Sequence, residues 1–156
     1  MICAVLMLSS CGYQLIRNDL ASDIRFDVPT ASNNSDFWGI ESELTQSVRQ
    51  QLHSLIGAQL GAQHSDYELK LSIDKVQRSA RVWSRDGSVN MGLASLRVKY
   101  QLLRAADSEE VLSNDISRSQ EFLLNLGESS TNAFSTAIAD ITQQIVLEIA
   151  EYLPTS

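Results

Sequence analysis

The pattern of apolar positions first indicates a helix in the N-terminal third of the chain. Apolar residues recur there at steps of three and four, which places them on one face of an α-helix. Ser35 is of a type that caps helices, and Gly57 and Gly61 interrupt the pattern after Ile56. The apolar face consists of Phe37, Ile40, Leu44, Val48, Leu52 and Leu55. We therefore predict an amphipathic helix from Ser35 to about Ile56.

The same spacing predicts a second helix near the end of the sequence. This helix runs from about Ser130 to Leu153, and Pro154 follows it. Its apolar face consists of Phe134, Ile138, Ile141, Ile145, Ile149 and Tyr152. Because a helix with one apolar face must cover that face with a second layer, the two helices require a sheet on which to pack.

Apolar and polar residues alternate in the other segments, as is typical of half-buried β-strands. A short strand is predicted where Ile24, Phe26 and Val28 alternate with charged residues, and Pro29 ends it. The last strand is predicted from Val111 towards Leu124. Its apolar residues in one phase are Ile116, Phe122 and Leu124.

The longest alternating segments predict a β-hairpin. One strand covers residues 67–82 and the returning strand covers residues 89–102. Between them, residues 84–87 contain an Asp-Gly pair, which supplies the positive φ that tight hairpin turns need. The apolar phase of the returning strand slips by one near Gly92 to Ala94. A β-bulge would produce such a slip, so we predict one there.

The predicted order of elements is β-α-β-β-β-α. We therefore predict an α/β two-layer sandwich in which two helices pack on one face of a four-stranded mixed sheet. The first strand can lie parallel to a neighbour because the first helix provides the crossover. The length of 156 residues is that of one domain.

The charge distribution adds a candidate site to this fold. The net charge of −7 disfavours binding to nucleic acid, because phosphate repels an acidic protein. The segment from Lys75 to Arg104 nevertheless contains seven basic residues and one acid, Asp86. The basic residues are Lys75, Arg78, Arg81, Arg85, Arg97, Lys99 and Arg104. The segment forms either a strand pair with solvated charged faces or a local anion site.

The two cysteines, Cys3 and Cys11, lie within the first eleven residues. Residues 2–8 are an apolar run that resembles the core of a secretory signal, and Leu8-Ser9-Ser10-Cys11 fits a bacterial lipobox. We expect residues 1–10 to be a signal peptide and residues 11–156 to be a periplasmic domain that is lipid-anchored through Cys11. Because no basic segment precedes the run, the natural signal is expected to begin upstream of Met1. The alternative is a buried N-terminal strand with a chance cysteine.

Residues that could carry catalysis form no convincing set in the sequence. There is no glycine-rich phosphate loop, and His53 and His64 alone make no metal cluster, so we expect neither enzyme activity nor a cofactor nor a metal. Trp38 is interpreted as a packing residue at the start of the first helix. Trp83 lies beside Arg85 at the hairpin tip, where it either packs or contacts a partner or lipid.

Several segments, in this order and spacing, resemble the LPS-assembly lipoprotein LptE family, also called rare lipoprotein B. They are Cys11-Gly12-Tyr13-Gln14-Leu15, Glu41–Leu52, Leu71–Val82, Arg85-Asp86-Gly87, Ser95–Leu103 and the closing Tyr152-Leu153-Pro154. The resemblance implies an outer-membrane lipoprotein on the periplasmic side that binds lipopolysaccharide. It also implies a β-barrel partner of the LptD type, in which the protein acts as a plug and assists assembly.

The resemblance also implies site residues. In the family, a basic residue at the tip of the central hairpin takes part in lipopolysaccharide binding, and Arg85 occupies that position here. A second basic residue of the family precedes the last helix, where this chain has Leu124–Glu128 and no basic residue. Arg78 and Arg81 could replace it, with Trp83 beside them. The alternatives are a secretin pilot lipoprotein, which would share the anchor but not the partner, and a periplasmic hydrolase.

Overall fold

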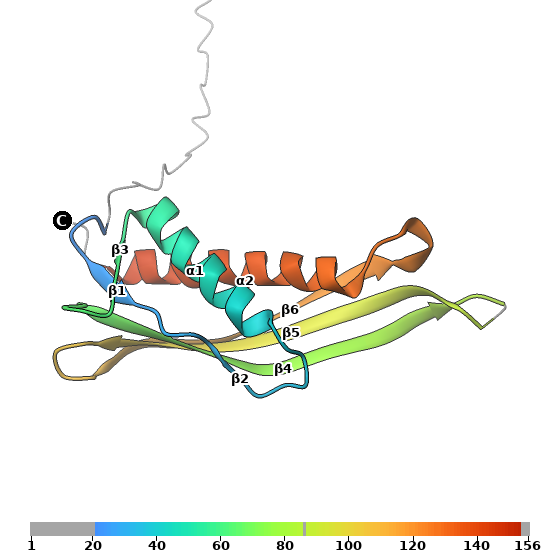
Figure 1. Cartoon of the computed structure of the whole chain (residues 1–156), viewed down its shortest axis with the longest axis horizontal. Helices are drawn as coiled ribbons and strands as arrows, with labels where there is room; N and C mark the ends of the chain where they lie inside the picture. Colours follow the sequence, from blue (N-terminus) through green and yellow to red (C-terminus); the bar gives the residue numbers. More distant parts are fainter. Residues whose placement is uncertain (1–20, 86, 154–156) are drawn as a thin grey trace, which may run out of the picture.

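The computed structural model describes residues 21–85 and 87–153, so Cys11 and the expected signal peptide lie outside the described residues. Three long strands form a curved sheet along the length of the molecule, and two helices lie on one of its faces (Figure 1). The elements are β1 (Arg25–Asp27), β2 (Ser32–Asn33), α1 (Ile40–Ile56), β3 (Gln59–Leu60), β4 (Tyr67–Trp83), β5 (Val89–Arg104), β6 (Glu110–Leu123), the 3-10 helix η1 (Leu124–Leu126) and α2 (Ser130–Tyr152).

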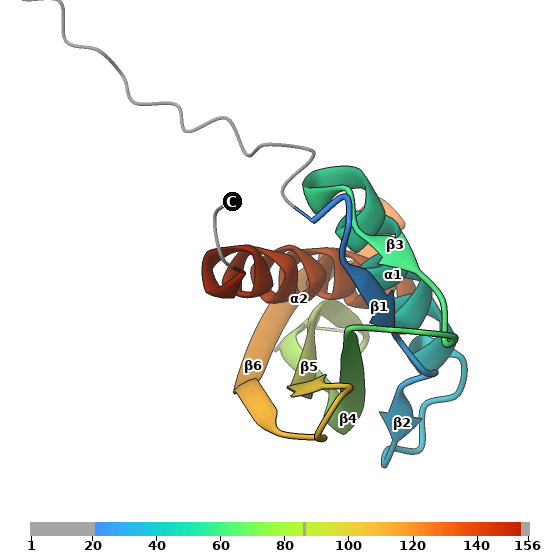
Figure 2. The ribbon, with the colours of Figure 1, turned by 90° about the vertical axis from the view of Figure 1, so that its left-hand side faces the viewer.

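The sheet is mixed, as predicted, but it has six strands where four were expected. Its order is β3-β1-β4-β5-β6, and β2 pairs separately with β4. The pairs among β4, β5 and β6 are antiparallel, whereas β1 is parallel to both β3 and β4. The additional strands β2 and β3 contain two residues each, too few to produce a recognisable alternation. Viewed from the end, the helices form a layer over the sheet (Figure 2).

The predicted helix faces form most of the core. Ile40, Leu44, Val48 and Leu52 on α1 are buried, and so are all predicted face residues of α2 except one. The exception is Tyr152, which is 37% exposed. It occupies the last turn of α2, where it is hydrogen-bonded to Arg104. At the other end of the helix layer, the rings of Phe37 and Phe134 meet edge to face, with centroids 5.5 Å apart.

The start of α1 differs from the prediction. The helix begins at Ile40 after Gly39, whose φ is +92°, and Ser35 does not cap it. The amide and hydroxyl of Ser35 instead donate to Asn33 Oδ1 at 2.9 and 2.7 Å. The Glu41 carboxylate accepts the Gly39 amide at 3.1 Å, and hydrogen bonds from its own backbone and from Asn33 lower its pKa. The chain therefore turns before the helix, which leaves Trp38 91% exposed; the packing interpretation of Trp38 is wrong.

The predicted bulge near Gly92 to Ala94 is confirmed only in its approximate place. A register shift adjoins Gly92, but the extra residue lies on β4: Ala80 pairs with Gly92 and Val82 with Met91. On β5 itself, Gly92 and Ala94 are buried and continue the inward phase of the buried residues from Leu96 to Leu102. The apparent slip on β5 arose because the inward residues at 92 and 94 are small, while the neighbouring Met91 and Leu93 are apolar.

Strand β6 ends earlier than predicted at its C-terminal end. Ile116 and Phe122 are buried as expected, but the strand ends at Leu123. Leu124 starts η1 and is 44% exposed. The chain then passes Gly127, whose φ is +78°, before Ser129 caps α2 by accepting the amide of Asn132 at 3.2 Å.

A polar cluster fixes α2 against the strands near its C-terminal half. Glu148 on α2 accepts hydrogen bonds from the hydroxyl of Tyr100, from Asn114 at 3.0 Å and from Gln144 at 2.8 Å. Burial and the bond to Glu148 raise the pKa of Tyr100. Burial acts to raise the pKa of Glu148, but the three hydrogen bonds outweigh it and hold that pKa below its ordinary value. The cluster holds the helix in one position along the sheet.

Candidate functional site

The predicted hairpin turn is present and projects beyond the helix layer (Figure 1). The Ser84 amide donates to the Ser88 carbonyl at 2.7 Å, and the Gly87 amide donates to the Ser84 carbonyl at 3.0 Å. Gly87 has a φ of +83°, which matches the predicted role of the Asp-Gly pair. Arg85 lies in this turn and is exposed.

The arginines of β4 and the turn lie along the hairpin and not in one pocket. Arg78 pairs in register with the buried Ala94, so it lies on the helix side of the sheet, where its Nη1 donates to Ser130 Oγ at 3.3 Å. Arg81 is the residue at which the register shifts between Ala80 and Val82. Residues 78 and 85 are seven positions apart, which corresponds to about 23 Å of extended strand. We call residues 78–85 the basic arm.

The cations of the hairpin divide into a paired and an unpaired group. Towards the base of the hairpin, Arg97 pairs with Asp115 at 3.7 Å, and Lys99 pairs with Asp74 at 3.4 Å. Within the described ranges 21–85 and 87–153, no carboxylate oxygen lies within 4.0 Å of the guanidinium groups of Arg78, Arg81 and Arg85. Among the described residues, the basic arm therefore carries positive charge without a carboxylate partner, while Arg97 and Lys99 are offset by neighbouring acids.

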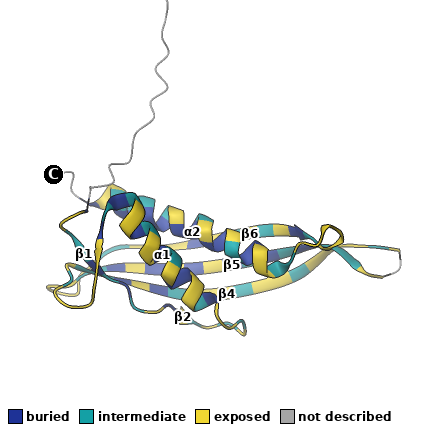
Figure 3. Ribbon diagram, turned by 45° about the horizontal axis from the view of Figure 1, so that its top comes forward, coloured by how far each residue is buried: buried dark blue, intermediate teal, exposed yellow. Residues whose placement is uncertain are grey.

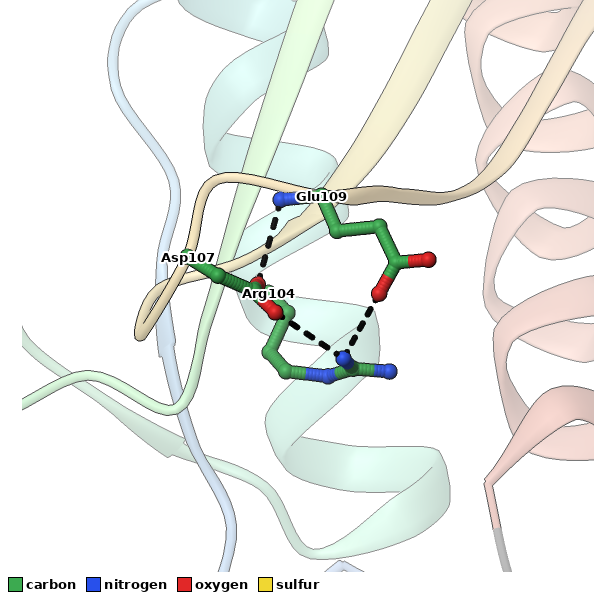
Figure 4. A network of polar contacts seen from close by, with 3 residues as sticks. All are labelled: Arg104, Asp107 and Glu109. Atoms are coloured by element: carbon green, nitrogen blue, oxygen red, sulfur yellow. Dashed lines mark hydrogen bonds and ion pairs between the residues drawn. The ribbon is translucent and has the colours of Figure 1, made fainter.

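The last cation of the segment, Arg104, belongs to the paired group (Figure 4). Its Nη1 lies 2.7 Å from Glu109 Oε2 and 3.2 Å from Asp107 Oδ2, and Asp107 Oδ1 accepts the Glu109 amide at 3.2 Å. A hydrogen bond to Tyr152, followed by the two carboxylates, raises the pKa of Arg104. These contacts close the turn between β5 and β6, which includes Ser108 at a φ of +58°. Arg104 is therefore a turn residue.

Exposed apolar side chains gather at the same end of the molecule as the basic arm. Trp83 is 62% exposed and Val82 44%, next to the arginines on the hairpin. Leu124 and Leu126 in η1 are 44% and 70% exposed, and Trp38 lies before α1. Figure 3 shows exposed and half-buried residues along this projecting part of the hairpin, while buried residues concentrate under the helices. An apolar surface bordered by cations is typical of a binding surface.

Two hollows meet at Arg78. The first, about 350 Å³, is floored by Gly92 and Phe122 and bordered by Ala80, Val89 and Leu124. We call it the Phe122 hollow. The second, about 470 Å³, extends towards Phe37, Trp38 and Phe134. Arg78 and Ser130 line both hollows.

The sequence analysis named Arg78 but missed the hollows beside it. Their lining comes from the hairpin, β6, η1 and the starts of both helices. The sequence carries no signal for these contacts, because the lining residues come from separate elements and, apart from Arg78 and Glu43, are apolar or small and polar.

The described residues contain no group of three or more His, Cys, Asp or Glu side chains arranged to hold a metal ion. None of the helices in the described part of the chain has the length and apolar character needed to cross a membrane. The chemistry that the site offers is recognition, through guanidinium groups and apolar side chains.

A family model described as "LptE: Lipopolysaccharide-assembly" matches residues 25–153. The chain belongs to this family. The match begins at β1 and ends after α2, so it includes the whole basic arm and both hollows. It does not reach Cys11, and the lipid anchor of this LptE-family chain therefore stays a prediction from the sequence.

Solved structures share the fold at low sequence identity. A protein from Xanthomonas campestris has a TM-score of 0.65 and 13% identity, with coverage of 83% of this chain and 85% of that one. A putative lipoprotein from Caulobacter crescentus has a TM-score of 0.59 and 17% identity, with coverage of 88% and 95%. The rare lipoprotein B from Shewanella oneidensis has a TM-score of 0.56 and 17% identity, with coverage of 81% and 94%. No curated protein matches the sequence.

Proposed function

We propose that this LptE-family chain is an outer-membrane lipoprotein that binds lipopolysaccharide and assists its insertion as the plug and assembly partner of an LptD-type barrel. The observation that carries the proposal is the basic arm. Arg78, Arg81 and Arg85 have no carboxylate partner among the described residues, and exposed Trp83 lies between them. Lipopolysaccharide combines phosphates with acyl chains, so its chemistry complements cations beside apolar side chains.

The guanidinium groups suit phosphate better than lysines would. Arginine presents a planar fork of donors that can bind two phosphate oxygens at once, and it keeps its charge at every physiological pH. A hydrogen bond to a charged group contributes about 1.5–3 kcal/mol when it is partly shielded from water. For a fully solvated pair the contribution falls to about 0–1 kcal/mol. The apolar side chains around the arm would supply that shielding once a lipid covers them.

The first described strand and the basic arm lie at opposite ends of the domain. β1, the first described strand, pairs with the start of β4 at Tyr67 and Glu68, whereas the arm is at the end of β4. A chain tethered through Cys11 would therefore enter the domain far from the hairpin tip (Figure 1). The tip would remain free to meet a ligand or the interior of a barrel.

Replacement of Cys11 by serine should abolish labelling by a fatty-acid probe.

A charge-matched pair of variants tests the binding function. The arm variant carries Arg78→Gln, Arg81→Gln and Arg85→Gln, and the control carries Lys70→Gln, Arg97→Gln and Lys99→Gln. Both lose three positive charges from the hairpin, but the control cations already pair with Glu68, Asp115 and Asp74 at 3.4–3.7 Å. The purified soluble domain should bind lipopolysaccharide at least tenfold more weakly in the arm variant. The control should bind within about twofold of the wild type, and equal losses in both would contradict the proposal.

The barrel partnership needs its own experiment in cells. Depletion of this protein should lower the amount of correctly assembled LptD-type barrel and the lipopolysaccharide at the cell surface. Affinity purification from detergent-solubilised membranes should recover the barrel. Recovery of a secretin in its place would favour the pilot lipoprotein alternative, and unchanged barrel and lipopolysaccharide levels would exclude the proposed partnership.

A further inference from the structure

The Phe122 hollow depends on one glycine. Gly92 and Phe122 face each other across the β5–β6 pair, and the Phe122 ring lies over Gly92. A Cβ atom at position 92 would lie 2.7 Å from two ring carbons of Phe122 and closer still to a third, so only glycine lets the ring lie there undisturbed. Phe122 is 5% exposed, and its position makes a flat apolar floor at the point where the helix layer ends.

The hollow has an apolar floor, mainly apolar walls and a cation at its rim. Ala80, Val89 and Leu124 supply the apolar walls, and Ser79, Ser129 and Ser130 complete the lining. The hollow has a volume of about 350 Å³, within the range of small-ligand sites. Arg78 stands at the rim, held by the bond from its Nη1 to Ser130 Oγ at 3.3 Å. The first turn of α2 contains no acidic residue, and the carboxylate that lines a hollow with Arg78, Glu43, belongs to the second hollow and not to the Phe122 hollow.

We propose that the Phe122 hollow holds one acyl chain of a bis-phosphorylated glucosamine disaccharide lipid, with a phosphate of that lipid on Arg78. The inference rests on the proposed function, and it assigns the acyl chain to the hollow and the phosphate to the rim. The apolar floor and walls exclude the headgroup, because burial of an unpaired polar group is costly. The guanidinium group of Arg78 at the rim binds the phosphate, so the acyl chain enters the hollow beside Arg78.

The spacing of the arginines favours this lipid over one with a single phosphate. Arg81 lies three residues beyond Arg78, about 10 Å along an extended strand, and the register shift at Arg81 interrupts the alternation that would otherwise place the two side chains on opposite faces. A disaccharide that carries a phosphate on each sugar can engage both cations. A glycerophospholipid such as phosphatidylglycerol has one phosphate and leaves one arginine without a partner.

The test fills the hollow with a side chain and compares two probes. Ala80 is exposed on its strand and lines the hollow, so Ala80→Trp should place an indole over the floor without disturbing the core. Gln77→Trp is the matched control, because Gln77 is exposed on the same strand, lies outside the basic arm and does not line the hollow. The probes are hexa-acylated lipid A and the same disaccharide bisphosphate stripped of all acyl chains. Thermal melts should show both variants folded.

We expect Ala80→Trp to weaken lipid A binding about tenfold or more, the effect of displacing two methylene groups. Its binding of the deacylated disaccharide should stay within twofold of the wild type. Arg78→Gln should weaken binding of both probes, and Gln77→Trp should weaken neither. Phosphatidylglycerol vesicles should compete poorly with lipid A.

Three results would overturn the assignment: unchanged lipid A affinity in Ala80→Trp, an equal loss for both probes, or phosphatidylglycerol competing as well as lipid A. Each of them leaves the proposed function standing as long as the wild type binds lipid A. Absence of lipid A binding by the wild-type protein would contradict the proposed function itself, so the two failures are distinguishable.

Discussion

Replacement of Gly92 by alanine tests the contact between the sheet and Phe122. At an ordinary strand position, this change removes the conformational freedom of glycine and stabilises a protein by about 0.5–1 kcal/mol. At Gly92 the new methyl group would meet the Phe122 ring at 2.7 Å or less, and the ring is 5% exposed with little room to move. Overpacking of this kind costs about 1–3 kcal/mol. We therefore expect net destabilisation of about 1–2 kcal/mol.

Two further variants make the reasoning falsifiable. Gly61→Ala is the matched control, since a Cβ there meets only Arg25 Cδ, at an ordinary 3.7 Å. Phe122→Leu removes the ring atoms, and in that background Gly92→Ala should become neutral or stabilising.

Urea titration and thermal melts measure the wild type, the three single variants and the double variant. A loss of about 1.5 kcal/mol lowers the Tm of a domain of this size by roughly 3–6 °C. If Gly92→Ala is as stable as the wild type, or destabilises equally in both backgrounds, the ring does not lie where we describe it.

Three other predictions concern the polar cluster, the tryptophans and the turn cation. Folding lowers the pKa of Glu148, so its ionised carboxylate stabilises the folded state. This stabilisation is complete above the ordinary pKa of about 4.5 and is lost as the pH falls through the lowered pKa of the folded protein. Glu148→Gln should therefore cost about 1 kcal/mol at pH 7 and reduce the acid dependence of stability, whereas Glu151→Gln should not. Trp38 and Trp83, the two tryptophans, should emit as solvated indoles, and lipid A should shift the Trp83 emission to shorter wavelength in Trp38→Phe. Arg104→Gln should leave the free energy of unfolding nearly unchanged, because its ion pairs are exposed.

The long elements could be predicted from sequence because their periods repeat many times. The face of α2 recurs over six turns, and the hairpin alternates over about fifteen residues on each side of the turn at Gly87. β2 and β3 contain two residues each and depend on pairing with distant strands. The start of α1 was misplaced because the Ser35 side chain has a local alternative partner in Asn33, which the apolar pattern does not reveal.

The site could be predicted only in part, because charge is visible in sequence and pairing is not. The seven basic residues from 75 to 104 look alike along the chain. Only the register shows that Arg97 and Lys99 have acidic partners while Arg78 and Arg85 have none among the described residues. The Phe122 hollow was beyond sequence reasoning, because its floor needs residues 92 and 122 side by side from strands thirty positions apart.

The central claim, that lipopolysaccharide is bound at the basic-arm end of the domain, is tested most directly by site-specific photocrosslinking in cells. A photoreactive amino acid would replace Trp83 in one strain and Leu60 in another. The two side chains are 62% and 41% exposed, and Leu60 lies in β3 at the opposite end of the sheet. We predict a lipopolysaccharide adduct from position 83 and none from position 60. Adducts of equal yield at both positions, or an adduct from position 60 alone, would contradict the account.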